Sequence, residues 1–199
     1  MICLGFGKSV ISAKYCLKRE VKMKILIFSD SHGDSDTMCS TTEKEQPDMI
    51  IYLGDGIEDA EKLGRKYPDI EIIKNLGNVD SEKQDEEWLK YAEICGKRFM
   101  MTHGHTFFTG KDMTQNEMTE ARDNILKFMF ENNIDITLHG HIHEPFIYRC
   151  QMTPSRHGWI MCPGRIGRIM SKESIIPVYG ILKVSESDAL EWQFVEVGF

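Results

Sequence analysis

Seven side chains that can bind metal stand directly after apolar, strand-sized runs along most of this chain. They are two aspartates, one asparagine and four histidines: Asp30, His32, Asp55, Asn78, His103, His141 and His143. Carboxylate, imidazole and amide donors together suit borderline divalent ions such as manganese, iron or zinc better than calcium. Because the carboxyl ends of parallel strands meet at one rim of a sheet, we expect these side chains to converge there.

Glycines and alternating apolar runs define the elements that must position these side chains. A glycine stands beside each cluster, where it lets the loop backbone come close to a bound ion or phosphate: Gly33, Gly54, Gly77, Gly104 and Gly140. Apolar runs at residues 24–29, 49–53 and 70–74 alternate with a helical pattern at 57–66, and context places another helix within 34–45. This alternation predicts a βαβαβ unit with a parallel sheet.

A hairpin and several further strands are expected after residue 81. Residues 88–94 and 97–102 are separated by a Cys-Gly pair, a spacing typical of an antiparallel hairpin. A short buried strand is expected at residues 135–139. Four more runs resemble successive strands of a second sheet, at residues 146–152, 159–162, 178–184 and 190–197.

The longest helix is expected to begin at Thr114, because Glu117 three residues later completes a capping box. Its apolar side chains recur on one face and are expected to pack into the core: Met118, Ala121, Ile125, Phe128 and Met129. Two mixed sheets packed face to face, with helices outside, would bury all of these strands. We therefore predict an α/β fold, a four-layer α-β-β-α sandwich of two mixed sheets.

Five ordered motifs carry a resemblance to a known family: SDSHG at 29–33, LGDG at 53–56, LGNVD at 76–80, THGH at 102–105 and HGHIH at 139–143. From residue 23 onward the chain resembles the calcineurin-like metallophosphoesterases, and within them the compact bacterial and archaeal phosphodiesterase group similar to YfcE. The segments CPG at 162–164 and VYGIL at 178–182 look like later strands of that group.

The resemblance implies a role for each candidate residue. One metal ion is held by Asp30, His32 and His143, and the other by Asn78, His103 and His141, while Asp55 bridges both. Asp55 and Asn78 therefore also count as catalytic residues. His105 is a further catalytic candidate, which contacts the substrate phosphate, passes a proton to a leaving group, or only donates a supporting hydrogen bond.

Two divalent ions about 3.5–4 Å apart polarise phosphoryl oxygens and supply a metal-bound hydroxide for in-line attack. Manganese is the expected cofactor, with iron, zinc, nickel and magnesium as alternatives. The resulting prediction is a phosphodiesterase acting on a small soluble phosphate ester. A phosphomonoesterase or nucleotidase with the same site is the alternative enzyme. A non-catalytic protein-binding scaffold, like the retromer subunit with this fold, is the alternative of a different class.

Val79 follows the asparagine at a position where many phosphomonoesterases of the superfamily carry a histidine. Valine cannot protonate a departing alkoxide, which is a poor leaving group. The sequence therefore predicts a preference for diesters or good leaving groups over alkyl monoesters.

Four polar side chains near the motifs are not among the predicted metal ligands. Asp80 is expected either to orient a ligand histidine or to cap the segment that follows it. His139 ends a buried strand and is expected to be a hydrogen-bonded structural residue outside the site. Arg165 and Arg168 depart from the group's pattern, and are either solvated or placed at the rim to bind a second anionic group of the substrate.

Composition supports one enzyme-sized domain. At 199 residues the chain suits a single core, so we expect residues 23–199 to form one metallophosphoesterase domain and residues 1–22 to be an N-terminal extension, which an upstream start choice would explain. The net charge of −7 and the lack of a basic stripe argue against a nucleic-acid partner. The expected partners are a small phosphate ester and, through exposed strand edges, further copies in a homodimer or homotetramer.

The six cysteines are scattered without a CxxC pair, which is typical of reduced thiols in a cytoplasmic protein. The basic residues within the first 22 positions interrupt the apolar core that a secretory signal needs. No apolar run approaches the length needed to span a bilayer, so no membrane partner is expected.

Overall fold

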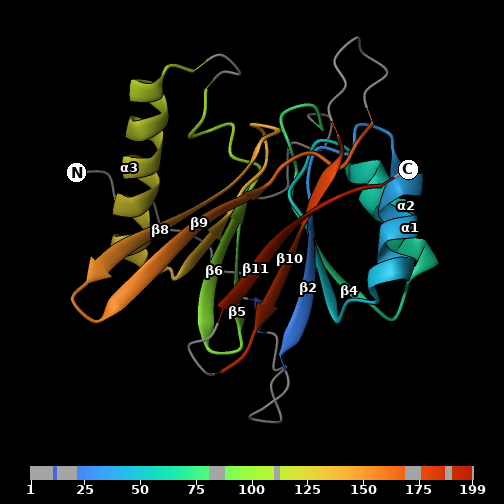
Figure 1. Cartoon of the computed structure of the whole chain (residues 1–199), viewed down its shortest axis with the longest axis horizontal. Coiled ribbons are helices and arrows are strands. Elements are labelled where there is room, and N and C mark those ends of the chain that lie inside the picture. Colours follow the sequence, from blue (N-terminus) through green and yellow to red (C-terminus); the bar gives the residue numbers. More distant parts are fainter. Residues whose placement is uncertain are drawn as a thin grey trace.

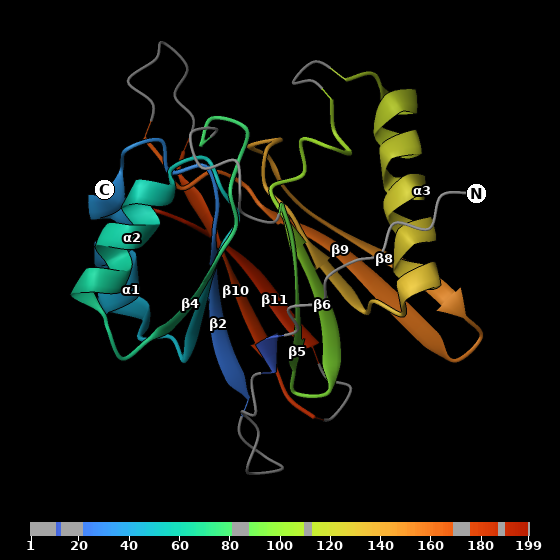
Figure 2. The same cartoon turned by 180° about the vertical axis from the view of Figure 1, so that it is seen from behind.

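The computed structural model describes residues 22–80, 88–109, 113–168, 176–186 and 190–198, together with the backbone of residues 11–12. Its strands form two mixed sheets that face each other, and helices cover both outer faces (Figure 1). The view from behind shows the same four layers (Figure 2). The predicted α-β-β-α sandwich is therefore confirmed.

The five-stranded sheet combines three strands from the first half of the chain with the last two strands. Its order is β11 (Leu190–Glu196), β10 (Val178–Val184), β2 (Met23–Phe28), β3 (Met49–Tyr52) and β4 (Glu71–Lys74). Strands β2, β3 and β4 run parallel, joined by α1 (Ser35–Glu45) and α2 (Ile57–Lys66). This is the βαβαβ unit that the alternating sequence pattern predicted.

The six-stranded sheet contains most of the second half of the chain. Its order is β1 (Ile11–Ser12), β5 (Leu89–Ile94), β6 (Lys97–Thr102), β7 (Ile136–Leu138), β9 (Arg156–Pro163) and β8 (Pro145–Thr153). Strands β5 and β6 form the expected antiparallel hairpin, and β7 runs parallel to both of its neighbours, β6 and β9. Helix α3 (Gln115–Asn132) covers the outer face.

One prediction about the sheets is wrong. The last four strands do not lie together in a second sheet, because β10 pairs antiparallel with β2 and β11 pairs with β10. Only β8 and β9 join the sheet of β5, β6 and β7. The apolar pattern identified each strand correctly, but it carries no information about which edge a returning strand will pair with.

Three apolar clusters hold the layers together. The inner faces of the two sheets meet in a cluster that includes Ile27, Ile51, Phe99 and Leu138. A second cluster packs α1 and α2 on the five-stranded sheet, and a third packs α3 on the six-stranded sheet. Each fully buried side chain of this kind contributes about 1.5–3 kcal/mol to folding.

Helix α3 begins and packs as its sequence predicts. The Thr114 side chain accepts a hydrogen bond from the Glu117 N–H, and the Glu117 carboxylate accepts one from the Thr114 N–H at 2.7 Å. Ala121, Ile125 and Met129 are buried on its inner face. The capping box and the apolar stripe therefore both position this layer.

Several sequence expectations concern parts of the chain that the structure covers incompletely. Residues 1–22 lie outside the described residues, apart from Lys22 and the backbone of β1, which pairs parallel with β5. Among the described cysteines, Cys39, Cys95, Cys150 and Cys162 form no disulfide, while Cys3 and Cys16 lie outside the described residues. No helix among the described residues is long and apolar enough to cross a membrane.

Candidate metal centre

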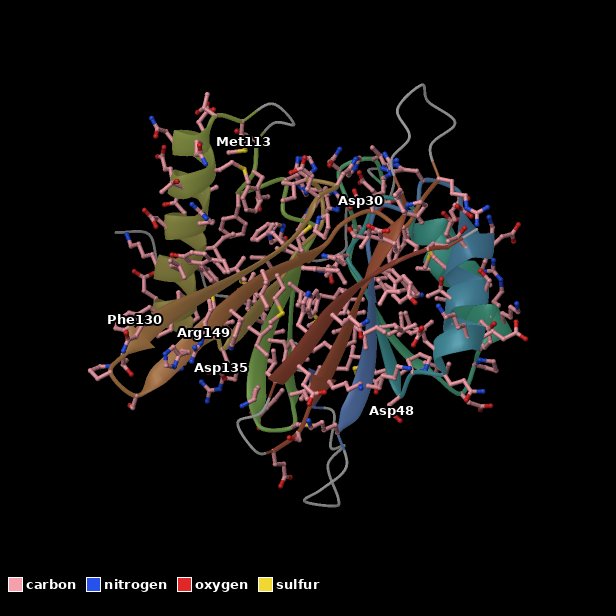
Figure 3. The ribbon with its side chains drawn as sticks, in the orientation of Figure 1. Asp30, Asp48, Met113, Phe130, Asp135 and Arg149 are labelled. Carbon is pink, nitrogen blue, oxygen red and sulfur yellow. The ribbon has the colours of Figure 1, made fainter. Side chains whose placement is uncertain are left out.

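The seven predicted ligands all come together at one rim of the sandwich. Strands β2, β3 and β4 of one sheet and β6 and β7 of the other deliver them, each in the loop that follows the strand. Figure 3 labels Asp30 at this upper rim, between the two sheets, whereas Asp48, just before β3, lies at the opposite end. The carboxyl ends of strands from both sheets thus enclose a single site.

A first group consists of Asp30, His32 and His143, whose ligand atoms all lie within 4.8 Å of one another. Asp30 Oδ1 is 3.1 Å from His143 Nε2 and 3.9 Å from His32 Nε2. The two imidazole rings meet edge to face with centroids 5.5 Å apart. Asp30 is fully buried while His32 reaches solvent, so this group lies between the core and the surface.

A second group consists of Asp30, Asp55 and His103, all of them buried. Asp55 Oδ2 lies 3.4 Å from His103 Nε2 and 4.0 Å from His32 Nε2. The Asp55 carboxylate therefore faces side chains of both groups, as a bridging ligand must.

Asn78 and His141 extend the second group. Asn78 Oδ1 is 3.1 Å from His103 Nε2, and the ring centroid of His141 is 5.1 Å from that of His103. The His141 N–H also donates to Asp30 Oδ2 at 3.1 Å, which joins the loop after β7 to the loop after β2. All seven predicted residues thus lie in one cluster.

The tautomer of His103 indicates what the cluster can hold. Its Nδ1 is 2.8 Å from the carbonyl oxygen of Leu53, which can only accept, so Nδ1 carries the proton. In the neutral ring the Nε2 lone pair then points at oxygens of Asp55 and Asn78. Such a lone pair facing oxygens is repulsive unless Nε2 is protonated or a cation lies between the atoms, and a divalent ion would bind all three donor atoms, so these residues fit one.

The pKa shifts of the buried groups also indicate a site that binds a cation. Burial opposes the charge on His103, yet the hydrogen bond to Asp55 and the negative charges of Asp30 and Asp55 outweigh it and raise the pKa of His103. Burial likewise raises the pKa of Asp30, but the hydrogen bond from His143 and nearby positive charge leave it lowered overall. Both carboxylates are therefore ionised, and the cluster requires positive charge.

The backbone of the site is strained at five of the seven candidate ligands. These residues have positive φ angles of 56°, 46°, 61°, 70° and 59° at Asp30, His32, Asp55, His141 and His143 respectively. The left-handed region costs a non-glycine residue of order 1 kcal/mol or more, and such strain concentrates at functional sites. The surrounding contacts therefore hold these side chains in place at the expense of local stability.

Asp80 supplies much of that support, in a role that the sequence did not suggest. Its Oδ2 accepts from the N–H groups of Asp55 and Gly77, each at 2.8 Å, and its Oδ1 accepts from Gly56 and Ile57 at 2.9 and 3.0 Å. Asp80 therefore caps α2, which precedes it, and fixes the backbone of Asp55. These hydrogen bonds go to backbone N–H groups and not to a histidine, so the first predicted role is wrong, while the segment that Asp80 was alternatively expected to cap begins at residue 81 and lies outside the described residues.

Two glycines allow the loops to meet beneath the cluster. A Cβ atom on Gly77 would collide with the Asp55 carboxylate, and one on Gly140 would collide with Ser29 Oγ. Ser29 Oγ in turn donates to Asp30 Oδ2 at 2.5 Å. Glycine is therefore required at both positions because any side chain would displace a candidate ligand.

The loop after β2 is tied to α2 by buried polar contacts. Ser31 Oγ donates to Asp59 Oδ2 at 2.8 Å, and the Gly33 N–H donates to the same oxygen at 2.7 Å. Ser31 Oγ also lies 2.7 Å from the Tyr52 hydroxyl. Sequence reasoning missed Asp59, whose only signal is an acidic residue in the first turn of an otherwise amphipathic helix.

The remaining predicted residues flank the cluster. His105 is half-buried, and its ring centroid lies 5.7 Å from that of His103 and 6.2 Å from that of His141. Val79 is 58% exposed, while its N–H donates to Asp55 Oδ1 at 3.0 Å. The His105 ring and the Val79 backbone therefore border the second group of ligands.

The two arginines have different surroundings. Arg165 is only 2% exposed, so the expectation of a solvated side chain is wrong for it, and its positive charge acts on His32. Arg168 is exposed; its N–H donates to Asp34 Oδ2 at 3.1 Å, and its side chain lies near the same oxygen. The positive charge of the buried Arg165 therefore acts on the first group of ligands.

His139 is structural, as predicted, but it is not fully hydrogen-bonded. Its ring stacks on Phe108 with centroids 4.6 Å apart, and Nδ1 lies 2.9 Å from the Gly140 carbonyl oxygen. Its buried Nε2 has no hydrogen-bond partner among the described residues. Burial therefore lowers the pKa of His139 from 6.5 to about 4.

This lowered pKa predicts acid sensitivity of the metal-free protein. Because the unfolded chain binds the proton more tightly than the native state, stability is retained above pH 6.5 and is lost as the pH falls toward 4. The contribution of this one group reaches about 3 kcal/mol. Urea denaturation at pH 7 and pH 4.5 should show a smaller acid-induced loss for His139→Leu than for the wild type. Equal losses in both proteins would show that His139 does not titrate in this way.

The fold and the rim cluster define a protein of the metallophosphoesterase class. A family model described as the calcineurin-like phosphoesterase superfamily domain matches residues 23–187. The chain therefore belongs to this superfamily, and the predicted family is confirmed. None of the curated proteins compared with the sequence gives a significant match.

Solved structures with the same fold include both esterases and a sorting protein. A novel archaeal phosphodiesterase is 22% identical, covers 88% of this chain and 100% of its own, and has a TM-score of 0.59. The phosphoesterase YfcE from E. coli is 18% identical with coverages of 88% and 100% and a TM-score of 0.55. A Vps29 variant from Entamoeba histolytica is 14% identical with coverages of 88% and 100% and a TM-score of 0.62. These likenesses establish the fold.

Proposed function

We propose that this chain is a dinuclear-metal phosphodiesterase that hydrolyses a small, soluble phosphate ester in the cytoplasm. The observation that carries the proposal is the convergence of seven carboxylate, imidazole and amide donors from both sheets on one rim. In this proposal Asp30, His32 and His143 hold one ion, while Asn78, His103 and His141 hold the other. Asp55 lies between them, and manganese is the proposed metal.

When bound, two divalent ions polarise the phosphoryl oxygens and activate water for in-line attack on phosphorus. The protein's own contribution is to keep the donors in place before substrate arrives. Leu53 fixes the His103 ring, and Asp80 fixes the Asp55 backbone. Preorganised donors of this kind lose little energy to rearrangement during the reaction.

His105 is proposed to contact the substrate phosphate. Burial and the charge of His103 lower its pKa, so the imidazole is neutral near pH 7. Its buried Nδ1 has no hydrogen-bond partner among the described residues, so the ring keeps unused hydrogen-bonding capacity. A neutral ring is a weak acid, which favours phosphate binding over protonation of a leaving group.

The exposed Val79 predicts which esters the enzyme hydrolyses well. The valine side chain cannot protonate an alkoxide, so kcat/KM for the aryl diester bis-p-nitrophenyl phosphate should exceed that for the alkyl monoester phosphoserine. Val79→His should raise the monoester rate about tenfold, because general acids contribute at least this much when well placed. Val79→Leu is the matched control and should leave the monoester rate unchanged. Comparable wild-type values for both esters would contradict this account.

Metal binding distinguishes the proposed enzyme from a second candidate function, that of a protein-binding scaffold. The structural likeness to Vps29 favours a protein-binding scaffold as the alternative, and a scaffold has no need of an intact ligand set. Equilibrium dialysis of metal-stripped protein should find about two manganese ions per chain. His143→Ala should lose one ion, while the exposed Asp36→Asn should retain both. A wild-type protein that binds no divalent ion would favour the scaffold.

A further inference from the structure

Trp88 is a half-buried tryptophan whose position core packing does not explain. The other two tryptophans, Trp159 and Trp192, both pack against the apolar core between the sheets. Trp88 belongs to none of the three apolar clusters that the described residues form. Its ring instead meets His105 edge to face, with centroids 4.5 Å apart.

The site itself fixes this tryptophan in place. Asn75 is fully buried, and its Nδ2 donates to the carbonyl oxygen of Met101 at 2.9 Å and to that of Trp88 at 3.4 Å. The Trp88 backbone is thereby attached to the end of β4 and to β6, the strand that delivers His103 and His105. The Trp88 backbone is therefore anchored near the site, and the ring contacts His105.

The two sides of the site differ in character. The row of ring contacts runs from His103 to His105 and on to Trp88. The exposed Val79 follows Asn78 in the chain, and its N–H donates to Asp55 Oδ1, which places its backbone at the second group of ligands. This side is aromatic and apolar. At the other end of the cluster, the buried Arg165 lies near His32, so that side carries positive charge.

A substrate with one charged and one apolar end matches this asymmetry. The charged phosphoryl oxygens would be attracted to the bound metal ions and to Arg165, which leaves the ester substituent to point toward Val79 and Trp88. A flat aromatic group there gains edge-to-face or stacked contact with the indole in addition to the burial of its apolar surface. An aliphatic substituent gains only the free energy of burying its apolar surface.

We propose that Trp88, with Val79 and His105, forms an aromatic wall that selects phosphate esters carrying an aryl or heteroaryl group close to the phosphorus. This inference rests on the proposed function and names the substrate class of that site. Trp88 acts as a specificity-determining residue, and the ions and their ligands do not depend on it.

Binding of unreactive phosphonates tests the wall independently of turnover. Isothermal titration of the manganese-loaded protein should show phenylphosphonate binding about tenfold more tightly than methylphosphonate. Trp88→Leu should reduce this ratio to about twofold with unchanged affinity for methylphosphonate, whereas Trp88→Phe should keep most of it. A ratio that is unchanged in Trp88→Leu would overturn the proposal.

Three further outcomes identify the group selected or contradict the proposed function. Adenosine 5′-methylenephosphonate carries its aromatic ring on a sugar, so a Trp88-dependent gain for it beyond that of phenylphosphonate would identify a nucleobase as the group selected. A gain for phenylphosphonate alone would identify a simple aryl ester. If neither phenylphosphonate nor methylphosphonate binds in the presence of manganese, and no diester is hydrolysed, the proposed function fails and the aromatic wall fails with it.

Discussion

Replacing Asp55 by asparagine should lower kcat/KM for bis-p-nitrophenyl phosphate by at least about 10³-fold. The Asp55 carboxylate faces His103 and His32, and so faces both groups of ligands. Asparagine removes the negative charge that both ions need while keeping the size of the side chain. It also tolerates the left-handed backbone at this position, where φ is 61°, so the fold should be retained.

The lower activity of Asp55→Asn should result from weaker metal binding and not from unfolding of the protein. Manganese binding should weaken in Asp55→Asn, while the circular dichroism spectrum should match that of the wild type. Asp36→Asn removes an exposed carboxylate in α1 and should leave both activity and metal binding unchanged. If Asp55→Asn kept activity within about threefold, Asp55 would not be a shared metal ligand.

Replacing Asp80 by alanine should both destabilise the protein and reduce its activity. Four N–H groups lose their acceptor, among them those of Asp55 and of the first turn of α2. Loss of a helix cap and of buried acceptors should lower the free energy of unfolding by about 3 kcal/mol. Because Asp55 is then released into other backbone conformations, kcat/KM should fall by about 10²-fold at a temperature where the variant is still folded.

A matched pair of variants isolates the effect of this carboxylate. Asp69→Ala removes an exposed aspartate from the turn before β4 and should change neither stability nor activity. Asp80→Asn keeps one acceptor oxygen and should fall between the wild type and Asp80→Ala in urea denaturation. A folded Asp80→Ala protein with wild-type manganese affinity and rate would show that the carboxylate does not position the site.

Much of this fold could be predicted from the sequence because its signals are local. The parallel unit of β2, β3 and β4 follows from apolar runs bounded by turn residues, and α3 follows from its capping box. The convergence of the ligands also follows, since side chains after parallel strands must meet at one rim. These patterns are properties of short segments, which the rest of the chain does not alter.

The failed predictions concern contacts between distant segments. The placement of β10 beside β2 depends on which sheet edge is open after the other strands have paired. The role of Asp80 depends on a loop returning over the start of α2, 23–25 residues earlier in the chain. The burial of Arg165 likewise results from the folded arrangement, since nothing in an arginine followed by Ile-Gly marks it as interior. Such contacts are set by topology, which residue pattern alone does not specify.

The most direct test of the central claim is hydrolysis of bis-p-nitrophenyl phosphate by metal-stripped protein before and after manganese is restored. We predict no measurable hydrolysis without metal and saturable hydrolysis once about two equivalents are bound, with slower turnover of an alkyl monoester. Equal rates with and without manganese, or no hydrolysis with manganese, iron, zinc, nickel or magnesium, would contradict the assignment of a dinuclear-metal phosphodiesterase.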